Sequence, residues 1–210
     1  MSRGLPDARL TDALKELGSL GTAHGVSMLA RMVGSPVMMD VPRLALGDSE
    51  WLLAELGGPG APVVAAELLL TGAFEARLFW ALPEADACVL AARLLRVPKV
   101  EPALPRPAVD ALTEASNVIA SAYADALARL LKVKLSPSTP DLVEGDAAAL
   151  AGDSTERKLV VQARFFSVEM PAYSGQLMMR LESGALEVLT PILERLGHFE
   201  AAAAASASPF

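Results

Sequence analysis

The sequence predicts a single domain of the α/β (α+β) class, built from two similar halves that share one sheet. An internal repeat supports this class, because four positions recur 98 residues later with the same spacing. They are Asp12, Glu16, Ser19 and Pro42 in the first copy, and Asp110, Glu114, Asn117 and Pro140 in the second copy. Each half also shows the pattern of a helix, three strands and a closing helix. Two such halves most economically merge their strands into one sheet that helices cover.

The first half begins with a helix predicted over residues 10–33. Gly18, Gly21 and Gly25 fall on the buried side of this helix. Glycine costs up to about 1 kcal/mol in a helix interior, so three glycines on one face predict close packing against another helix. Strands follow over residues 37–46, 63–70 and 74–82, and a helix over residues 82–96 closes the half. Pro42 implies that the first of these strands bends or lies at an edge.

Residues 97–107 separate the halves, since four prolines in eleven residues cannot continue a regular element. A long helix is predicted over residues 108–132, and Pro105 and Pro107 mark its start because proline is tolerated in a first helical turn. Strands are predicted over residues 133–137, 157–169 and 176–181, with an alanine-rich acidic segment between the first two. A closing helix is predicted over residues 183–196, with Ser183 as its N-cap and Gly197 at its end.

These elements divide the chain into an N-terminal arm (1–9), one domain (10–197) and a tail (198–210). The two halves of the domain cover about residues 10–97 and 108–197. Most of the tail is the low-complexity sequence EAAAAASASPF. We expect this segment to be disordered, because it has little apolar surface to bury.

Composition limits the possible partners and the compartment. Hydrophobic residues make up 52% of the 210 residues, which is ample for a substantial core. No apolar run reaches the roughly 18 residues of a membrane-spanning helix, and the N-terminus lacks the apolar core of a signal peptide. A net charge of −7 without a basic cluster argues against binding nucleic acid or an anionic membrane surface. The single cysteine, Cys88, excludes an internal disulfide framework and fits the reducing cytoplasm. We therefore expect a cytoplasmic protein that does not insert into membranes.

The helix over residues 108–132 carries a polar stripe opposite its apolar side when it is projected at about 100° per residue. The stripe consists of Asp110, Glu114, Asn117 and Ser121, followed by the small residues Ala124 and Ala128. Because the apolar side must face a core, the stripe faces outward. The small residues would let another macromolecule approach Glu114 and Asn117. A solvated helix face is the alternative interpretation of the stripe alone.

The spacing of the second copy resembles the signature of the CheC/CheX/FliY family of chemotaxis phosphatases. Three residues separate Asp110 from Glu114, two separate Glu114 from Asn117, and twenty-two separate Asn117 from Pro140. The segments LKELGSLGTAHG and LTEASNVIASAY also align without gaps between the two copies. The resemblance covers roughly residues 10–197 and implies one CheC-like pseudo-two-fold domain with a mostly antiparallel sheet. Within the family the chain is most similar to CheC, since no FliN-type domain follows residue 197.

The resemblance implies hydrolysis of the aspartyl phosphate of a CheY-like response regulator, or receiver. Asn117 would enter the receiver's active site and orient the attacking water, because phosphoryl transfer is catalysed mainly by positioning and charge stabilisation. Glu114 would pair with the receiver's active-site lysine and fix the docking register. Asp110 would cap the helix or support its start electrostatically, and Pro140 would shape the loop beside the site. The Mg²⁺ would belong to the receiver, so no cofactor of this chain is expected.

The first copy departs from the family pattern at the position that would orient water. Ser19 stands where the second copy has Asn117, and its hydroxyl reaches less far than a carboxamide. We predict that Glu16 still docks a receiver while hydrolysis there is weak or absent. Asp12 and Pro42 are the supporting positions of this degenerate site.

A protein of another class is the competing hypothesis. The middle domain of the flagellar switch protein FliM shares the CheC-like fold without the phosphatase signature. The chain would then be a non-catalytic adaptor that binds a response regulator, or a FliM-like switch module. CheD, which binds some CheC proteins, is a further possible partner that no residue here supports or excludes.

Other chemistries find little support in the sequence. His24 and His198 lie far apart, and neither has a second histidine or cysteine at a metal-ligand spacing. We therefore predict no metal site. Cys88 lies between apolar residues, where an inert buried thiol is expected. No Gly-x-Ser-x-Gly elbow is present to make a serine nucleophile.

Overall fold

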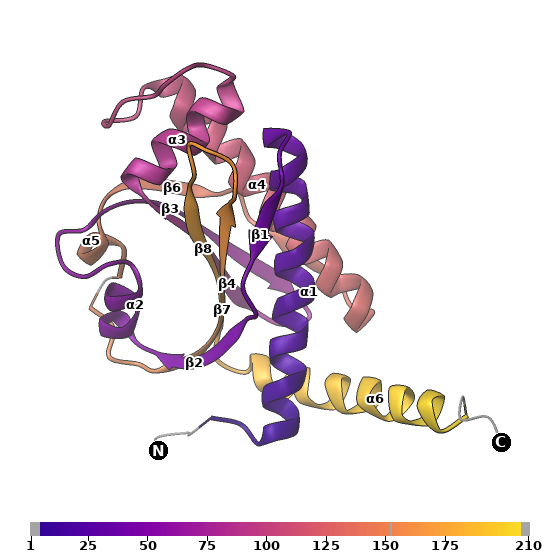
Figure 1. Ribbon diagram of the computed structural model, residues 1–210. Helices are drawn as coiled ribbons and strands as arrows, with labels where there is room; N and C mark the ends of the chain where they lie inside the picture. Colours follow the sequence, from indigo (N-terminus) through magenta and orange to yellow (C-terminus); the bar gives the residue numbers. More distant parts are fainter. Residues whose placement is uncertain (1–4, 152, 207–210) are drawn as a thin grey trace.

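The computed structural model describes residues 5–151 and 153–206, except the side chains of residues 149, 150 and 198–206. Helices and strands follow one another in the same order in both halves (Figure 1). The first half comprises α1 (Ala8–Val33), β1 (Val37–Met39), β2 (Arg43–Gly47), α2 (Ser49–Glu55), β3 (Pro62–Gly72), β4 (Ala76–Pro83) and α3 (Glu84–Leu95). The second half comprises α4 (Arg106–Leu131), β5 (Leu135–Pro137), β6 (Asp141–Asp146), α5 (Ala147–Ala151), β7 (Lys158–Ser167), β8 (Ser174–Leu181) and α6 (Ala185–Ser206).

The strands form one sheet in which every pairing is antiparallel within the described residues. Its order is β1-β7-β8-β4-β3-β5, with β2 also on β7 and β6 also on β3. The centre is the pairing of β4 with β8, one strand from each half. The short strands of each half pair with the long strand of the other half. This exchange joins the halves into one domain and confirms the predicted α+β fold with a shared antiparallel sheet.

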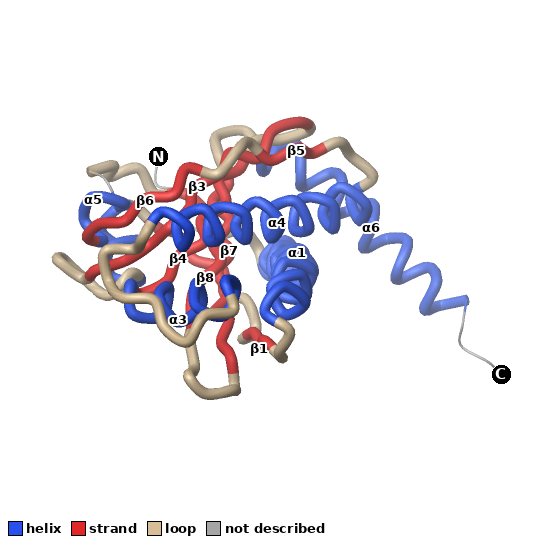
Figure 2. Tube along the Cα trace, turned by 90° about the horizontal axis from the view of Figure 1, so that it is seen from above, coloured by secondary structure: helices blue, strands red, loops and turns tan. Residues whose placement is uncertain are grey.

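Helices cover both faces of the sheet. The long helices α1 and α4 and the helix α3 lie on one face, whereas α2 and α5 lie on the other (Figures 1 and 2). Side chains of β3 alternate between the two layers, as a strand requires. Val64 and Ala66 belong to the larger core beneath α1 and α4, and Val63 and Ala65 belong to the smaller core beneath α2 and α5.

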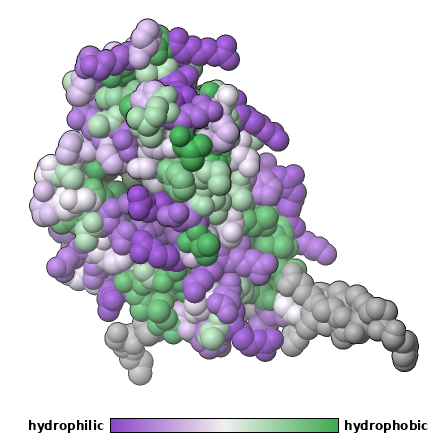
Figure 3. Space-filling model, in the orientation of Figure 1, coloured by the Kyte–Doolittle hydropathy of each residue, from purple (hydrophilic) through white to green (hydrophobic). Residues whose placement is uncertain are grey.

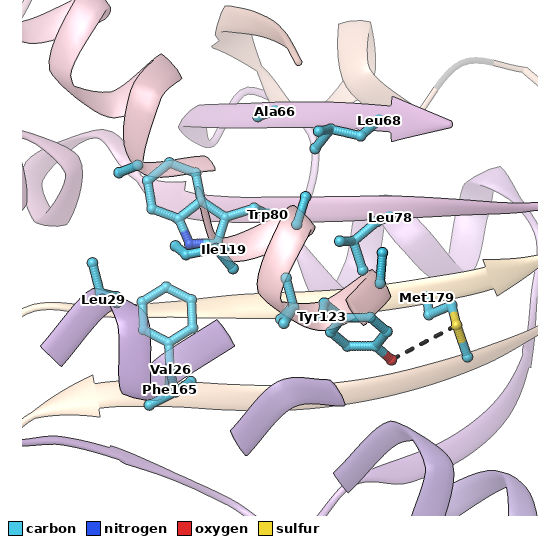
Figure 4. Packing of buried hydrophobic residues seen from close by; sticks show 14 of the residues in the cluster. Val26, Leu29, Ala66, Leu68, Leu78, Trp80, Ile119, Tyr123, Phe165 and Met179 are labelled. Carbon is cyan, nitrogen blue, oxygen red and sulfur yellow. Dashed lines mark hydrogen bonds between the residues drawn. The ribbon is translucent and has the colours of Figure 1, made fainter. Parts of the chain in front are cut away.

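The larger core is built around the contact between α1 and α4. Two of the three glycines confirm the predicted close packing against another helix, whereas Gly18 faces Val161 of β7 instead. A Cβ added at Gly21 would lie 2.6 Å from Tyr123 Cζ, and one added at Gly25 would lie 2.9 Å from Ile119 Cγ2. Tyr123 fills the space below the helices and donates to Met179 Sδ at 3.7 Å (Figure 4). Burial raises the pKa of the Tyr123 hydroxyl.

Both ends of α1 have the caps that helices prefer. The Asp7 carboxylate accepts the Leu10 N–H at 2.9 Å, which satisfies one of the free donors of the first turn. Gly34 ends the helix in the left-handed conformation, with φ of 70°. α1 is therefore held in place from its first turn to its last.

The element order differs from the prediction in its polar segments. The strand predicted over residues 37–46 is split into β1 and β2 around Pro42, which cannot donate a ladder hydrogen bond. The acidic segment after Pro140 forms β6 and α5, because pairing with β3 stabilises a strand of weak intrinsic preference. α2 was likewise not predicted. Each half therefore has one strand and one short helix more than expected.

The last helix also differs. α6 begins at Ala185, so Ser183 is not its N-cap, and it continues through Gly197 to Ser206. The residues after Gly197 are mostly alanine, the strongest helix former. The predicted arm (1–9) and tail (198–210) fall partly on residues 1–4 and 207–210, which lie outside the described residues, and those bounds stay predictions. Among the described helices, none is long and apolar enough to cross a membrane.

Candidate functional site

The second copy lies on the outer face of α4. Leu112 and Ile119 are buried in the core, whereas Glu114 is exposed and Asn117 is half-buried on the opposite side. Glu114 and Asn117 are three residues apart, so their side chains lie one above the other on the same face. One small residue of the predicted stripe is placed differently, because Ala124 is buried.

Glu114 and Asn117 are free of intramolecular partners within the part of the chain that the structure describes. The polar residues between and before them are satisfied by the helix itself. Thr113 Oγ1 donates to Val109 O at 2.8 Å, and Ser116 Oγ donates to Thr113 O at 2.8 Å. The carboxylate and the carboxamide thus keep their full hydrogen-bonding capacity for a partner that approaches this face.

Asp110 does not cap α4, contrary to one of the roles considered for it. The N-cap is Pro105, which makes no side-chain cap hydrogen bond. Asp110 instead pairs with Arg106 one turn earlier, at 2.8 Å, on an exposed surface. Such a pair contributes at most about 1 kcal/mol. Its role is therefore a modest local support of the first turns of α4.

Pro140 belongs to the short loop 138–140 between β5 and β6, both of which contact α4. Ser138, which the sequence did not single out, fixes this loop to β3. Its N–H donates to Leu69 O at 2.8 Å, and its hydroxyl accepts the Leu69 N–H at 3.0 Å. The same hydroxyl donates to Thr139 O at 3.0 Å. A serine two residues before the motif proline is the only sequence signal for this anchor.

The first copy has the same scaffold on α1. Glu16 is exposed and Ser19 is half-buried, like Glu114 and Asn117. Asp12 lies 4.0 Å from Lys15 on an exposed surface. Pro42 is buried against this part of α1, since its Cβ would lie 3.9 Å from a Cβ added at Gly18. The loop before it is also tied to a long strand, because the Asp40 N–H donates to Arg164 O at 2.9 Å.

The structure does not bring the two copies together. Gly21 of α1 and Ile119 of α4 face the other helix. At about 100° per residue, Glu16 lies about 140° around α1 from Gly21, and Asn117 lies about 160° around α4 from Ile119. The two copies therefore point to opposite flanks of the helical layer and form two separate sites.

The remaining candidates form no site. His24 is exposed, with Nδ1 3.0 Å from Leu20 O, and the side chain of His198 lies outside the described residues. Cys88 is buried, and burial, followed by the charges of Glu84, Glu101 and Glu144, raises the pKa of its thiol. Across residues 5–151 and 153–206, no three metal-ligating side chains gather in one place.

Comparison with known proteins agrees with this geometry. The model of the CheC-like family matches residues 108–144, which contain every position of the second copy and none of the first. The chain is 29% identical over 134 residues to the CheY-P phosphatase CheC of Bacillus subtilis (strain 168). That match covers 62% of this chain and 64% of the B. subtilis protein, so it spans just under two thirds of that relative.

Solved structures share the fold. FliY from Thermotoga maritima superposes with a TM-score of 0.73 at 15% identity, covering 92% of this chain and all of that one. The FliM middle domain from H. pylori superposes with a TM-score of 0.62 at 10% identity, covering 90% of this chain and 99% of that one. The shared fold, the matching family segment and the related sequence define a protein of CheC-like architecture. The chain is thus similar to the CheC/CheX/FliY family in the sequence of this segment and in its fold.

Proposed function

We propose that the chain hydrolyses the aspartyl phosphate of a CheY-like receiver, with Asn117 as the catalytic residue. The observation that carries this proposal is the pair Glu114 and Asn117, which lies on the outer face of α4 and has no intramolecular partner among the described residues. This pair also falls inside the segment that matches the CheC-like family. An unpartnered carboxamide that projects from a rigid helix can enter a partner's active site without first breaking a bond of its own.

Asn117 would hold a water in line with the phosphorus atom of the receiver's phosphoaspartate. The carboxamide oxygen accepts a hydrogen bond from this water, and orientation of a nucleophile can lower a barrier by several kcal/mol. The receiver supplies the Mg²⁺ and the phosphoryl group, so the chain contributes geometry. Glu114, one turn away, would pair with the receiver's active-site lysine. This pair would set the depth at which Asn117 enters.

The first copy would bind without efficient hydrolysis. Glu16 is exposed on α1 as Glu114 is on α4, so the docking contact has an equivalent. Ser19 lacks the reach and the carbonyl oxygen of a carboxamide. The proposed phosphatase therefore has one effective site. CheD as a partner and the cytoplasm as the location also remain proposals.

A non-catalytic adaptor is the second candidate function. The FliM middle domain has the same fold, and Ser19 shows that one copy lacks the motif residue. An adaptor would bind the receiver through Glu16 or Glu114 and leave its phosphate in place. The two candidates thus differ in whether the phosphate lifetime changes on binding.

The deciding experiment follows the decay of an acyl-phosphorylated CheY-like receiver with the purified chain. We expect faster decay with the wild type, near-complete loss with Asn117→Ala and with Glu114→Ala, and no loss with the matched variant Ser19→Ala. Unchanged decay together with measurable receiver binding would establish the adaptor. Residual activity near half in Asn117→Ala would contradict a single effective site.

A further inference from the structure

A large apolar groove lies where the start of α1, strands β2 and β7, and the start of α6 meet. Its volume is about 900 Å³, which is in the upper range of ligand-binding sites. Its leucines come from five different elements, α1, β2, β7, β8 and α6; they are Leu10, Leu46, Leu159, Leu181 and Leu186. Leu159 and Leu181 are buried at its base. The other three are only half-buried, so the groove exposes apolar side chains. Hydrophobic surface is visible beside β2 at the lower edge of Figure 3.

The internal repeat contains a second version of this groove, whose residues are offset by 98 positions in one direction or the other. There the start of α4, the end of β6 and the start of α3 take the places of α1, β2 and α6. Ala108 corresponds to Leu10, and Cys88 corresponds to Leu186. This counterpart is filled: Ala108 is 0% exposed and Cys88 only 5% exposed.

The linker between the halves fills the counterpart as an irregular segment, which turns at Ala103 with a positive φ of 59°. Its side chains Val100 and Leu104, four residues apart, are 8% and 7% exposed and belong to the larger core. Its backbone is fixed by carboxylates on both walls. The Ala103 N–H donates to Glu84 at 3.3 Å, and the Leu104 N–H donates to Glu144 at 3.2 Å. The filled counterpart therefore shows that a groove of this architecture holds a chain segment with two apolar side chains four residues apart.

We propose that the open groove binds a segment of a partner protein that lacks regular secondary structure, with two apolar side chains spaced like Val100 and Leu104 and at least one basic residue. The basic residue follows from charge, because the groove is lined by three carboxylates and two cations. Glu156 and Glu182 are both paired with Lys158, whereas Glu187 and Arg157 have no ion-pair partner within residues 5–151 and 153–206. The carboxylates of the groove therefore exceed its cations by one. Complementary charge at the rim guides a partner and fixes its register.

This interaction surface is distinct from the proposed phosphatase site. None of its lining residues belongs to either copy of the motif. The inference rests on the pseudo-two-fold repeat and stands whether or not Asn117 is catalytic. Binding in the groove would give the chain a second partner besides a receiver.

The test uses a fluorescein-labelled peptide with the linker sequence VPKVEPALPRP, residues 97–107, titrated with the full chain in a fluorescence anisotropy assay. We expect saturable binding that is at least tenfold weaker with Leu186→Glu and with Leu10→Glu, which place a charge in the groove from two different helices. The peptide that carries Leu104→Glu should also bind at least tenfold more weakly. Val188→Glu is the matched control, because Val188 is 37% exposed on α6 and does not line the groove.

Thermal melts test whether each variant remains folded. Because the two groove variants lie on different helices, the result does not depend on a single substitution. Absence of saturable binding, or equal binding by wild type and both groove variants, would overturn the proposal. Light scattering gives a further contrary outcome. A mass that doubles with protein concentration, and does so only when Leu186 is intact, would assign the groove to a second copy of this chain instead.

Discussion

At the scale of single residues, the difference between Ser19 and Asn117 should set the number of active sites. The two side chains occupy equivalent half-buried positions on α1 and α4. If the carboxamide is the missing part, Ser19→Asn should raise receiver dephosphorylation, up to about twofold, because a second site that can orient water is restored. The assay follows the decay of receiver phosphate with the single variant, which keeps Glu16. In the double variant Ser19→Asn, Glu16→Ala the gain should disappear. No gain in the single variant would mean that the scaffold of the first copy no longer docks a receiver.

Ser138 is the second residue-scale case, and it should act through the loop that carries Pro140. Its hydroxyl both accepts from Leu69 and donates to Thr139, and a hydrogen bond of this kind contributes about 0.5–1.5 kcal/mol. Ser138→Ala should therefore raise the KM for phosphorylated receiver about three- to tenfold and leave kcat within twofold, with rescue by Ser138→Thr. Ser136→Ala, on the neighbouring strand, is the control with no expected effect. A fall in kcat at constant KM would place Ser138 in the chemical step.

The motif positions could be predicted from the sequence, whereas Ser138 could not, for a physical reason. Asp110, Glu114 and Asn117 lie on one helix, where spacing alone fixes the face that each side chain occupies. Ser138 acts through a hydrogen bond to a residue 69 positions away, and that pairing exists only once β3 and β5 are side by side. The burial of Ala124 was also missed, because it depends on what packs against α4.

At the scale of elements, the contact between α1 and α4 should be the feature least tolerant of added volume. The Cβ of Gly21→Val would lie 2.6 Å from Tyr123 Cζ and 2.7 Å from Leu127 Cδ1, which is closer than van der Waals contact. Overpacking of a close-packed core costs about 1–3 kcal/mol. The measurement is the free energy of unfolding from urea titration. Ala23→Val on the exposed face of the same helix should change it by less than about 0.5 kcal/mol. Equal effects of the two variants would show that the helices can separate without cost.

The long helices and strands were predictable because each buries one regular face over many residues. The short elements were not, since β6 is polar and mostly exposed and exists because β3 offers it a strand edge. The end of α6 was predicted too early. Glycine is common at the end of a helix. α6 nevertheless continues through Gly197, because the residues that follow favour a helix.

At the scale of the whole molecule, a charge network on the face opposite α1 and α4 joins the two halves. Glu182 of the second half contacts Arg77 of the first half at 3.2 Å, and it also pairs with Lys158 and with Arg180. Burial opposes ionisation of Glu182. The hydrogen bond and charge of Lys158, with the charges of Arg180 and Arg77, outweigh burial and lower its pKa. The sequence could not predict this cluster, because its members come from three strands.

This lowered pKa makes the stability of the domain depend on pH in a definite direction. In the unfolded chain Glu182 would titrate near the ordinary glutamate value of about 4.3, so its stabilising effect is complete above that pH. The effect is lost as pH falls through the lower pKa of the folded state, where the carboxylate must take up a proton. Urea titrations from pH 7 to pH 3 should therefore show a smaller acid loss of stability for Glu182→Gln than for wild type. Glu156→Gln, which touches the same Lys158 from a more exposed position, should keep the wild-type profile. Parallel profiles of wild type and Glu182→Gln would mean that the network holds the two halves together without depending on the charge of this carboxylate.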